Sequence, residues 1–314
     1  MELPKITFWK RFGSLIAFLA ICLIFGILSD RFFTLSNFMN VARQVSINAI
    51  VACGMTLVII TGGIDLSVGS IVGLTGCIAL VVMNATDSDF FGLFMGLASG
   101  AAVGLANGVL VAYFRLPPFI MTLATLTAAR GLALEVTAGQ PVTRSTPVAV
   151  YLGQGFVGPV PVPICLMVII VFATHFILSS TATGSYIYSV GGNEEAARLS
   201  GVKVGRIKVF VYAVSGLCSA LTGLILTARL ASAQPNIGIG FELDAIAAVV
   251  LGGTSLMGGE GKITGTLLGA FVIGVLNNGF NLLNVSPYYQ MIAMGLVIVI
   301  AILFDQFLKT RVKG

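Results

Sequence analysis

Residues 191–201 read GGNEEAARLSG and form a compact, strongly polar segment between long apolar stretches. Asn193 suits the N-cap position of a helix, because its side-chain oxygen can accept a hydrogen bond from a free backbone N–H. Glu194 and Glu195 follow it and place negative charge at the positive end of the helix dipole. Gly201 can adopt the left-handed conformation that ends a helix. The stretch therefore predicts a short capped helix, with a solvated turn as the alternative.

The composition around this segment excludes an ordinary soluble domain. Of the 314 residues, 57% are hydrophobic and 9% are charged, whereas soluble domains carry roughly 25% charged residues. Basic residues gather in three clusters, within 5–11, 198–208 and 309–313, and none is long or aromatic enough to indicate a nucleic-acid partner. The five cysteines are scattered through apolar runs and show neither metal-ligand spacing nor a disulfide framework.

Ten apolar segments follow one another along the chain, and several match the ~20 residues needed to cross a bilayer. They are residues 12–28, 44–61, 65–84, 90–113, 119–137, 162–180, 207–229, 242–254, 263–284 and 288–306. We therefore predict an all-α polytopic membrane protein with a single transmembrane domain over residues 1–314. The first segment exceeds the ~7–15 residues of a signal-peptide core, so a retained span is expected rather than a cleaved signal.

The basic clusters set the expected orientation, because basic loops stay in the cytoplasm. All three clusters lie there if the chain crosses six times before residue 181 and four times after residue 208, which leaves both termini cytoplasmic. The opposite side then carries the acidic turn at Asp87 and Asp89 and the loop 140–163. It also carries three residues that run against the rule, Arg31, Arg43 and Arg144.

The fourth apolar segment has a glycine at every fourth position. These residues are Gly92, Gly96, Gly100, Gly104 and Gly108. A missing side chain lets helix backbones approach closely in membranes. The spacing therefore predicts a smooth groove that receives another helix.

A short internal repeat is visible in the sequence. Residues 62–66, GGIDL, align with residues 252–256, GGTSL, and the pair Asn107-Gly108 aligns with Asn278-Gly279. Glycine-interrupted segments at corresponding places in two halves indicate broken helices around a translocation path. Two repeat-related halves are thus expected, with chance similarity of glycine-rich segments as the alternative.

The sequence carries no recognisable catalytic or metal site. Residues 257–264, MGGEGKIT, resemble a phosphate loop, but Ile263 stands where a hydroxyl residue should follow Lys262. His175 is the only histidine, and no carboxylate lies at ligand spacing from it. No nucleophile is paired with a base. We expect neither an enzyme active site nor bound ATP in this chain.

Polar residues within or beside the apolar segments are the candidate functional groups. A charge at the bilayer centre costs ~2.5–3.5 kcal/mol on insertion scales, and most charged residues here lie near segment ends. A proton- or sodium-driven carrier usually holds ionisable groups at the midplane, so the energy for transport is expected from elsewhere. Four amides lie within or near the segments, and they either bond neighbouring helices or, with Asp65, line a path for a hydroxyl-rich solute; they are Asn107, Asn277, Asn278 and Asn281.

Five long blocks carry a resemblance to a known family. They are NAIVACGMTLVIITGGIDLSVGS (48–70), GGNEEAARLSGVKVGRIK (191–208), ARLASAQP (228–235), ELDAIAAVVLGGTSLMGGEGKITGTLLGA (242–270) and LNNGFNLLNVSPYYQM (276–291). In these blocks the chain resembles the ribose-type sugar permeases of ATP-binding-cassette importers. The blocks occur in the right order, and the likeness runs nearly end to end.

The resemblance implies a ten-helix permease of the larger, type II importer fold in a bacterial inner membrane. Two copies would enclose the path, a cytoplasmic ATPase would bind ATP and Mg²⁺, and a periplasmic sugar-binding protein would dock outside. The helix at residues 193–200 would be the coupling helix, seated in a groove of the ATPase. Its contacting residues would be Asn193, Glu194, Glu195, Arg198, Leu199 and Gly201.

The family resemblance also sets the expected cargo. It implies import of a monosaccharide, D-ribose first, with xylose, arabinose, galactose or a furanose signal as alternatives. Selectivity in the family typically resides in the binding protein, so the resemblance assigns no sugar ligands to this chain. An ion-coupled secondary carrier, a channel or a membrane enzyme would be a different class of function.

Overall fold

The computed structural model describes residues 3–313, except for the side chains of residues 3–12, 298, 301–302 and 304–313. The basic side chains of the two terminal clusters lie outside this description. The longer helices are α1 (Leu3–Leu28), α2 (Leu35–Ile60), α3 (Val68–Thr86), α4 (Asp89–Ala112), α5 (Pro118–Val136), α7 (Val162–Ser180), α10 (Val204–Leu230), α12 (Ile263–Leu282) and α13 (Pro287–Lys313). The shorter elements are α6 (Pro147–Gln154), α8 (Ala182–Gly192), α9 (Glu194–Leu199), α11 (Phe241–Leu251) and the strands β1 (Val142–Thr143), β2 (Phe156–Val157), β3 (Val160–Pro161) and β4 (Ser232–Ala233).

Each of the ten predicted apolar segments falls on one helix, namely α1–α5, α7 and α10–α13. Within the described part, seven helices are long and apolar enough to cross a membrane: α2, α3, α4, α5, α7, α10 and α12. Helix α11 has only 11 residues, about half of the ~20 that cross the hydrocarbon core. The polytopic all-α class is confirmed, whereas the number of ten crossings stays a prediction.

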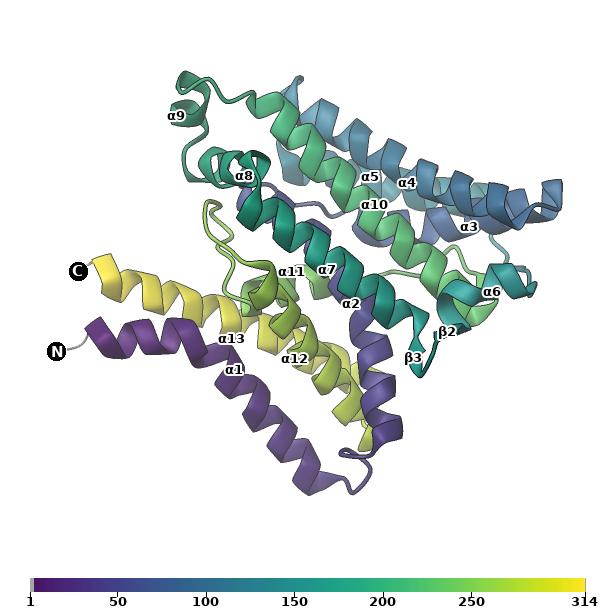
Figure 1. Ribbon diagram of the computed structural model, residues 1–314, viewed down its shortest axis with the longest axis horizontal. Helices are drawn as coiled ribbons and strands as arrows, with labels where there is room; N and C mark the ends of the chain where they lie inside the picture. The colour runs from purple at the N-terminus through teal and green to yellow at the C-terminus, as the bar shows by residue number, and fades with distance from the viewer. Residues whose placement is uncertain (1–2, 314) are drawn as a thin grey trace.

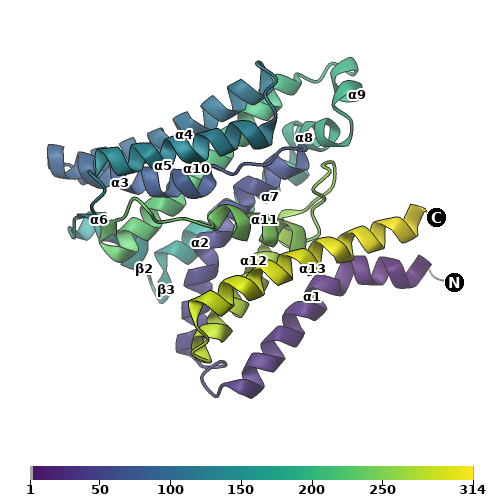
Figure 2. The same ribbon diagram turned by 180° about the vertical axis from the view of Figure 1, so that it is seen from behind.

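The two ends of the bundle differ in what they carry (Figures 1 and 2). The first turns of α1 and the last turns of α13 lie at the same end as α8 and α9, which we call the α9 end. The α3–α4 turn and α6 lie at the opposite end, which we call the α6 end. This is the arrangement expected if residues 191–208 and both termini face one side of the membrane.

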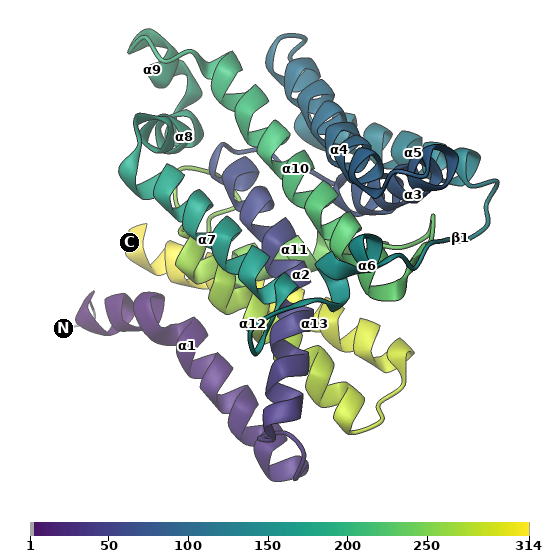
Figure 3. The same cartoon turned by 45° about the vertical axis from the view of Figure 1, so that its right-hand side comes forward.

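Helix α2 forms the centre of the bundle (Figure 3). Its residues 49–60 are all buried, and α7, α10, α11 and α12 pack around it. A helix that is apolar on every face, without one polar stripe, must be enclosed by other elements. The second predicted segment therefore serves as the core against which the other helices assemble.

The glycines of α4 make close contact with α3 and α10. All five are buried, and a Cβ added at any of them would lie no more than 2.9 Å from an atom of a neighbouring helix. At Gly92 that atom belongs to Met83 of α3, and at Gly104 it is the carbonyl oxygen of Tyr212 in α10. The groove along α4 thus receives two helices, because its glycines lack the side chains that would hold them apart.

Helical structure is interrupted at two glycine pairs, one between α2 and α3 and the other between α11 and α12; we call these interruptions the two breaks. Gly62 and Gly253 both adopt the left-handed conformation, with φ of 80° and 82°. Each donates its N–H to the carbonyl three residues earlier, Ile59 and Val250 respectively. The structure therefore equates Gly62 with Gly253, one residue away from the predicted alignment of 62 with 252.

The predicted equivalence of Asn107-Gly108 with Asn278-Gly279 is wrong. Asn107 lies on α4, the second helix after the first break, whereas Asn278 lies on α12, the first helix after the second break. The likeness between the two breaks is therefore local to the helix ends. Two complete repeat-related halves remain a prediction.

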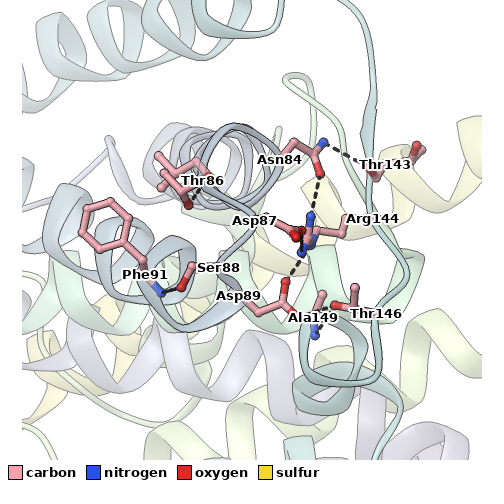
Figure 4. A network of polar contacts seen from close by, with 11 residues as sticks. Asn84, Thr86, Asp87, Ser88, Asp89, Phe91, Thr143, Arg144, Thr146 and Ala149 are labelled. Atoms are coloured by element: carbon pink, nitrogen blue, oxygen red, sulfur yellow. Dashed lines mark hydrogen bonds and ion pairs between the residues drawn. The ribbon is translucent and has the colours of Figure 1, made fainter.

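Arg144 fastens the long loop at the α6 end (Figure 4). Its guanidinium donates to Asp89 at 2.6 Å and to Asp87 at 3.0 Å, and Thr146 also donates to Asp89. These hydrogen bonds raise the pKa of Arg144 above its ordinary value. Strand β1 beside it pairs with β4. Arg144, one of the three arginines that run against the positive-inside rule, therefore has two carboxylate partners.

Candidate coupling surface and buried polar network

Helix α9 is built as its sequence predicts. The side-chain oxygen of Asn193 accepts a hydrogen bond from the N–H of Ala196 at 2.9 Å. Glu194 and Glu195 occupy the first turn, and the chain leaves the helix through Gly201 at φ 86°. The structure shortens the predicted helix, 193–200, to residues 194–199, because Asn193 and Ser200 are the caps on either side.

The surface of α9 is exposed and mixed in character. Leu199 is 80% exposed, although an apolar side chain of this size gains from burial. Arg198 pairs with Glu195, and Lys208 pairs with Glu194 at 2.7 Å. Exposed pairs of this kind add little stability. The helix therefore presents an uncovered leucine among charges that a partner can readily rearrange.

A cleft of about 630 Å³ lies between α9, the α4–α5 loop and the start of α10. Its lining includes Glu194 and five basic residues, Arg115, Arg198, Lys203, Arg206 and Lys208. Within the part of the chain that the structure describes, Arg115, Lys203 and Arg206 have no ion-pair partner. The cleft is therefore positively charged, which suits an acidic partner surface.

A fully buried carboxylate lies just beyond the first break. Asp65 accepts hydrogen bonds from the backbone N–H and the hydroxyl of Ser67, and from the hydroxyl of Ser215 in α10 at 2.8 Å. Asn107 of α4 donates to the Ser67 hydroxyl at 2.9 Å and accepts from Thr125 of α5 at 2.6 Å. Four elements are thus joined through one network, which is necessary because an unsatisfied buried polar group is costly.

This network lies in the half of the bundle nearer the α9 end. Asn107 is five residues before the end of α4, and Thr125 is seven residues after the start of α5. At 1.5 Å per residue these positions lie about 8–11 Å from the helix ends that face α9. The Asp65 network is therefore close enough to the α9 end for a displacement of the helix ends there to affect it.

Arg130 holds a segment of consecutive turns, residues 234–240, and this contact was not predicted from the sequence. Residues 234–240 connect β4 to α11, and the guanidinium of Arg130 donates to the carbonyl oxygens of Pro235 and Ile237, the latter at 2.9 Å. It also donates to the Gly69 carbonyl at 3.4 Å. Carbonyl oxygens in turns lack the regular partners that a helix provides, so a side-chain donor satisfies them here. The arginine of α5 thus stabilises the irregular start of α11.

The amides predicted to line a path have different surroundings. Asn107 is fully buried and both ends of its amide are hydrogen-bonded as described. Asn278 exchanges two hydrogen bonds with Asn37 of α2, at 2.8 and 3.0 Å, and is 8% exposed. Asn277 is partly exposed on the same helix. Asn107 and Asn278 therefore join helices, which is the first of the two roles that the sequence left open.

Ser215 and Thr125 are the polar residues that the sequence did not single out, whereas Arg130 was recognised as a charge inside an apolar segment but its partners were not predicted. Serine and threonine hydroxyls are common in membrane helices and bond the preceding turn, so their presence alone carries no signal. Arg130 did have one, because a charge inside an apolar segment is expected to have a partner. Among the described residues, no group of three or more His, Cys, Asp or Glu could hold a metal ion, and the five cysteines are unpaired.

Together, the apolar helices, the two breaks, the buried network and the exposed charged helix define a polytopic membrane protein. Comparison with known proteins gives the family. Residues 37–302 match the family described as branched-chain amino acid transport system, permease component. The chain belongs to this family of transport permeases.

Individual relatives cover nearly the whole chain. The ribose import permease protein RbsC of Haemophilus influenzae is 49% identical over 95% of this chain and 94% of its own length. RbsC of Bacillus subtilis is 46% identical over 95% and 93%. The L-arabinose transport system permease protein AraH of Escherichia coli is 38% identical over 99% and 96%. No solved structure matches the chain.

Proposed function

We propose that this chain is the membrane-spanning permease subunit of an ATP-driven importer for D-ribose. The observation that carries the proposal is its 46–49% identity, over more than nine-tenths of both chains, to permeases named for ribose import. The permease named for L-arabinose is more distant, at 38%. We therefore assign ribose as the substrate from the higher identity to the ribose permeases, and we assign no residue of the chain as a sugar ligand.

The proposal includes the partners that such a subunit needs. Two copies of the chain enclose the path in a bacterial inner membrane, with both termini in the cytoplasm. An ATP-binding-cassette ATPase docks on α9 and hydrolyses the ATP, and a periplasmic sugar-binding protein delivers the sugar at the α6 end. The exposure of Leu199 and the unpaired basic residues of the neighbouring cleft support docking at the α9 end.

On this proposal the chain converts a push at α9 into rearrangement of the path. The capped helix acts as a short rigid lever, because its N-cap, its acidic first turn and its left-handed exit fix both ends. The buried Asp65 network lies about 8–11 Å below the helix ends at that surface and binds α3, α4, α5 and α10 into one unit. Alternating exposure of the path then follows from movement of such units against one another.

Uptake into proteoliposomes tests the function. The chain is reconstituted with its ATPase, ATP is enclosed, and the binding protein with labelled ribose is added outside; a hydrolysis-deficient ATPase is the control. We expect uptake that is abolished in the control and is competed by unlabelled ribose but not by xylose, arabinose or galactose. Competition by another sugar would reassign the substrate. Uptake that persists in the control and follows an imposed ion gradient would make the chain a secondary carrier.

A further inference from the structure

The loop between α11 and α12, residues 252–262, reaches the α9 end and contacts two other segments there (Figures 1 and 2). Tyr188 of α8 donates its hydroxyl hydrogen to the carbonyl oxygen of Gly261 at 2.8 Å. The N–H of Gly259 donates to the carbonyl oxygen of Ile60, the last residue of α2, at 2.9 Å. The loop therefore joins α8 to the C-terminal end of α2.

Glycines bring the three backbones into direct contact. A Cβ at Gly191 of α8 would lie 1.7 Å from the oxygen of Ile60, and one at Gly258 would lie 2.9 Å from the oxygen of Gly191. Gly259 adopts φ 75°, and its Cβ would lie 2.9 Å from the Cα of Gly192. Backbone-to-backbone contact of this kind cannot be relieved by turning a side chain. We name these residues the glycine junction: Ile60, Tyr188, Gly191, Gly258, Gly259 and Gly261.

The junction is connected to α9 on one side and to both chain breaks on the other. Asn193 is at once the C-cap of α8 and the N-cap of α9, so the two helices are joined by a single residue. Ile60 directly precedes the first break, and Asp65 lies five residues further along the chain. The loop itself forms the second break. One path for a displacement of α9 therefore runs through α8 to the junction and on to both breaks. A second path runs through α10, from the Glu194–Lys208 pair to Ser215 and Asp65, and it reaches the first break alone.

We propose that the glycine junction transmits the movement of α8 and α9 to the two broken helices, with Tyr188 as a positioning residue that keeps the α11–α12 loop attached to α8. This inference rests on the proposed function. Tyr188 does not contact the cargo or the ATPase in this role. Its hydroxyl sets how much of the motion at α9 is delivered to α12, so its loss lowers coupling rather than docking.

The first test replaces Tyr188 with phenylalanine in the complete complex. Tyr188→Phe keeps the ring and removes only the hydrogen bond to Gly261, while Tyr186→Phe makes the same change two residues away, where the side chain is 44% exposed. We expect sugar uptake per ATP hydrolysed to fall about fivefold in Tyr188→Phe and to be unchanged in Tyr186→Phe. A fivefold change corresponds to about 1 kcal/mol, the usual net value of one hydrogen bond.

The second test uses a pair of glycines with the same backbone conformation. Gly259→Ala and Gly139→Ala both force alanine into the left-handed region, at φ 75° and 71°. Only the Cβ at 259 meets a neighbour, because nothing lies within 4 Å of the one at 139. We expect Gly259→Ala to lose coupling further than Tyr188→Phe, and Gly139→Ala, in the loop after α5, to retain it.

The outcomes separate this inference from the proposed function. Co-purification of the ATPase is measured for every variant and is expected to equal that of the unmodified chain. If the unmodified complex shows no ATP-dependent uptake, the proposed function fails. If that uptake is present and Tyr188→Phe transports as many sugars per ATP as Tyr186→Phe, the junction does not transmit the movement and the inference is overturned.

Discussion

Replacing Gly104 with alanine tests whether contact between α4 and α10 limits the stability of the bundle. The new Cβ would lie 2.4 Å from the carbonyl oxygen of Tyr212 and 3.0 Å from the Cα of Gly216, both of them backbone atoms of α10. A carbon–oxygen contact needs about 3.3 Å, so the two helices must separate locally by roughly 0.9 Å. The same substitution at Gly131 of α5 meets nothing within 4 Å and serves as the matched control.

The expected magnitude follows from two opposing terms. Overpacking costs about 1–3 kcal/mol, whereas alanine gains about 1 kcal/mol over glycine in a helix. Gly104→Ala should therefore lose up to about 2 kcal/mol, while Gly131→Ala gains about 1 kcal/mol. For 314 residues at about 2.1 cal/mol/K per residue, a gap of about 1–3 kcal/mol between the two variants corresponds to roughly 2–5 °C in Tm.

The chain offers its own reporter for this measurement. Cys53, Cys77 and Cys218 are buried, so a thiol-reactive dye labels them only as the protein unfolds on heating. Purified Gly104→Ala should give a labelling midpoint below that of the unmodified chain, and Gly131→Ala a midpoint above it. Equal midpoints for the two variants would refute the argument that α4 and α10 are held together by backbone contact at these glycines.

Two further predictions concern charged residues at opposite ends of the molecule. The double variant Arg115→Glu/Lys203→Glu should weaken co-purification of the ATPase about tenfold or more, because the cleft loses its positive charge. Arg31→Glu, at the α6 end, is the control. Equal recovery of the ATPase with both variants would exclude the cleft as a docking surface. Arg144→Ala should speed proteolysis of the 137–161 segment, because it removes the hydrogen bonds that hold this segment to Asp87 and Asp89. Asp87→Ala, at a side chain 93% exposed, should have little effect, and an equal rate for both variants would contradict the assignment.

The features predictable from the sequence are local ones. Asn193, the two glutamates and Gly201 specify a helix through contacts within a few residues, so the helix and its caps are confirmed with only its ends shifted. The glycines of α4 lie on one face of a single helix, so their spacing predicts a groove but does not identify the helices that pack into it. The ten apolar segments predict where helices occur, but the short α11 shows that hydropathy does not determine whether a segment crosses.

The features that escaped prediction depend on long-range contacts. Asp65 and Ser215 are 150 residues apart, and Arg130 bonds carbonyls more than 100 residues away. Both partners in each case are of common types, so no spacing rule connects them. The sequence alignment of the two breaks was wrong by one residue. It matched glycine pairs by identity and placed residue 62 opposite 252, whereas the backbone conformation of Gly62 corresponds to that of Gly253.

The position of the buried polar network connects these observations. A carboxylate with no basic partner among the described residues is a costly way to join helices, since apolar residues of similar volume would often be as stable or more so. Its hydrogen bonds, however, join α3, α4, α5 and α10 in one fixed geometry, and apolar packing defines such geometry less strictly. The network begins five residues after Ile60, at which α8 and the α11–α12 loop meet. A rigid polar unit placed directly behind a backbone junction moves as a whole when the junction moves, which is what the proposed coupling through α9 requires.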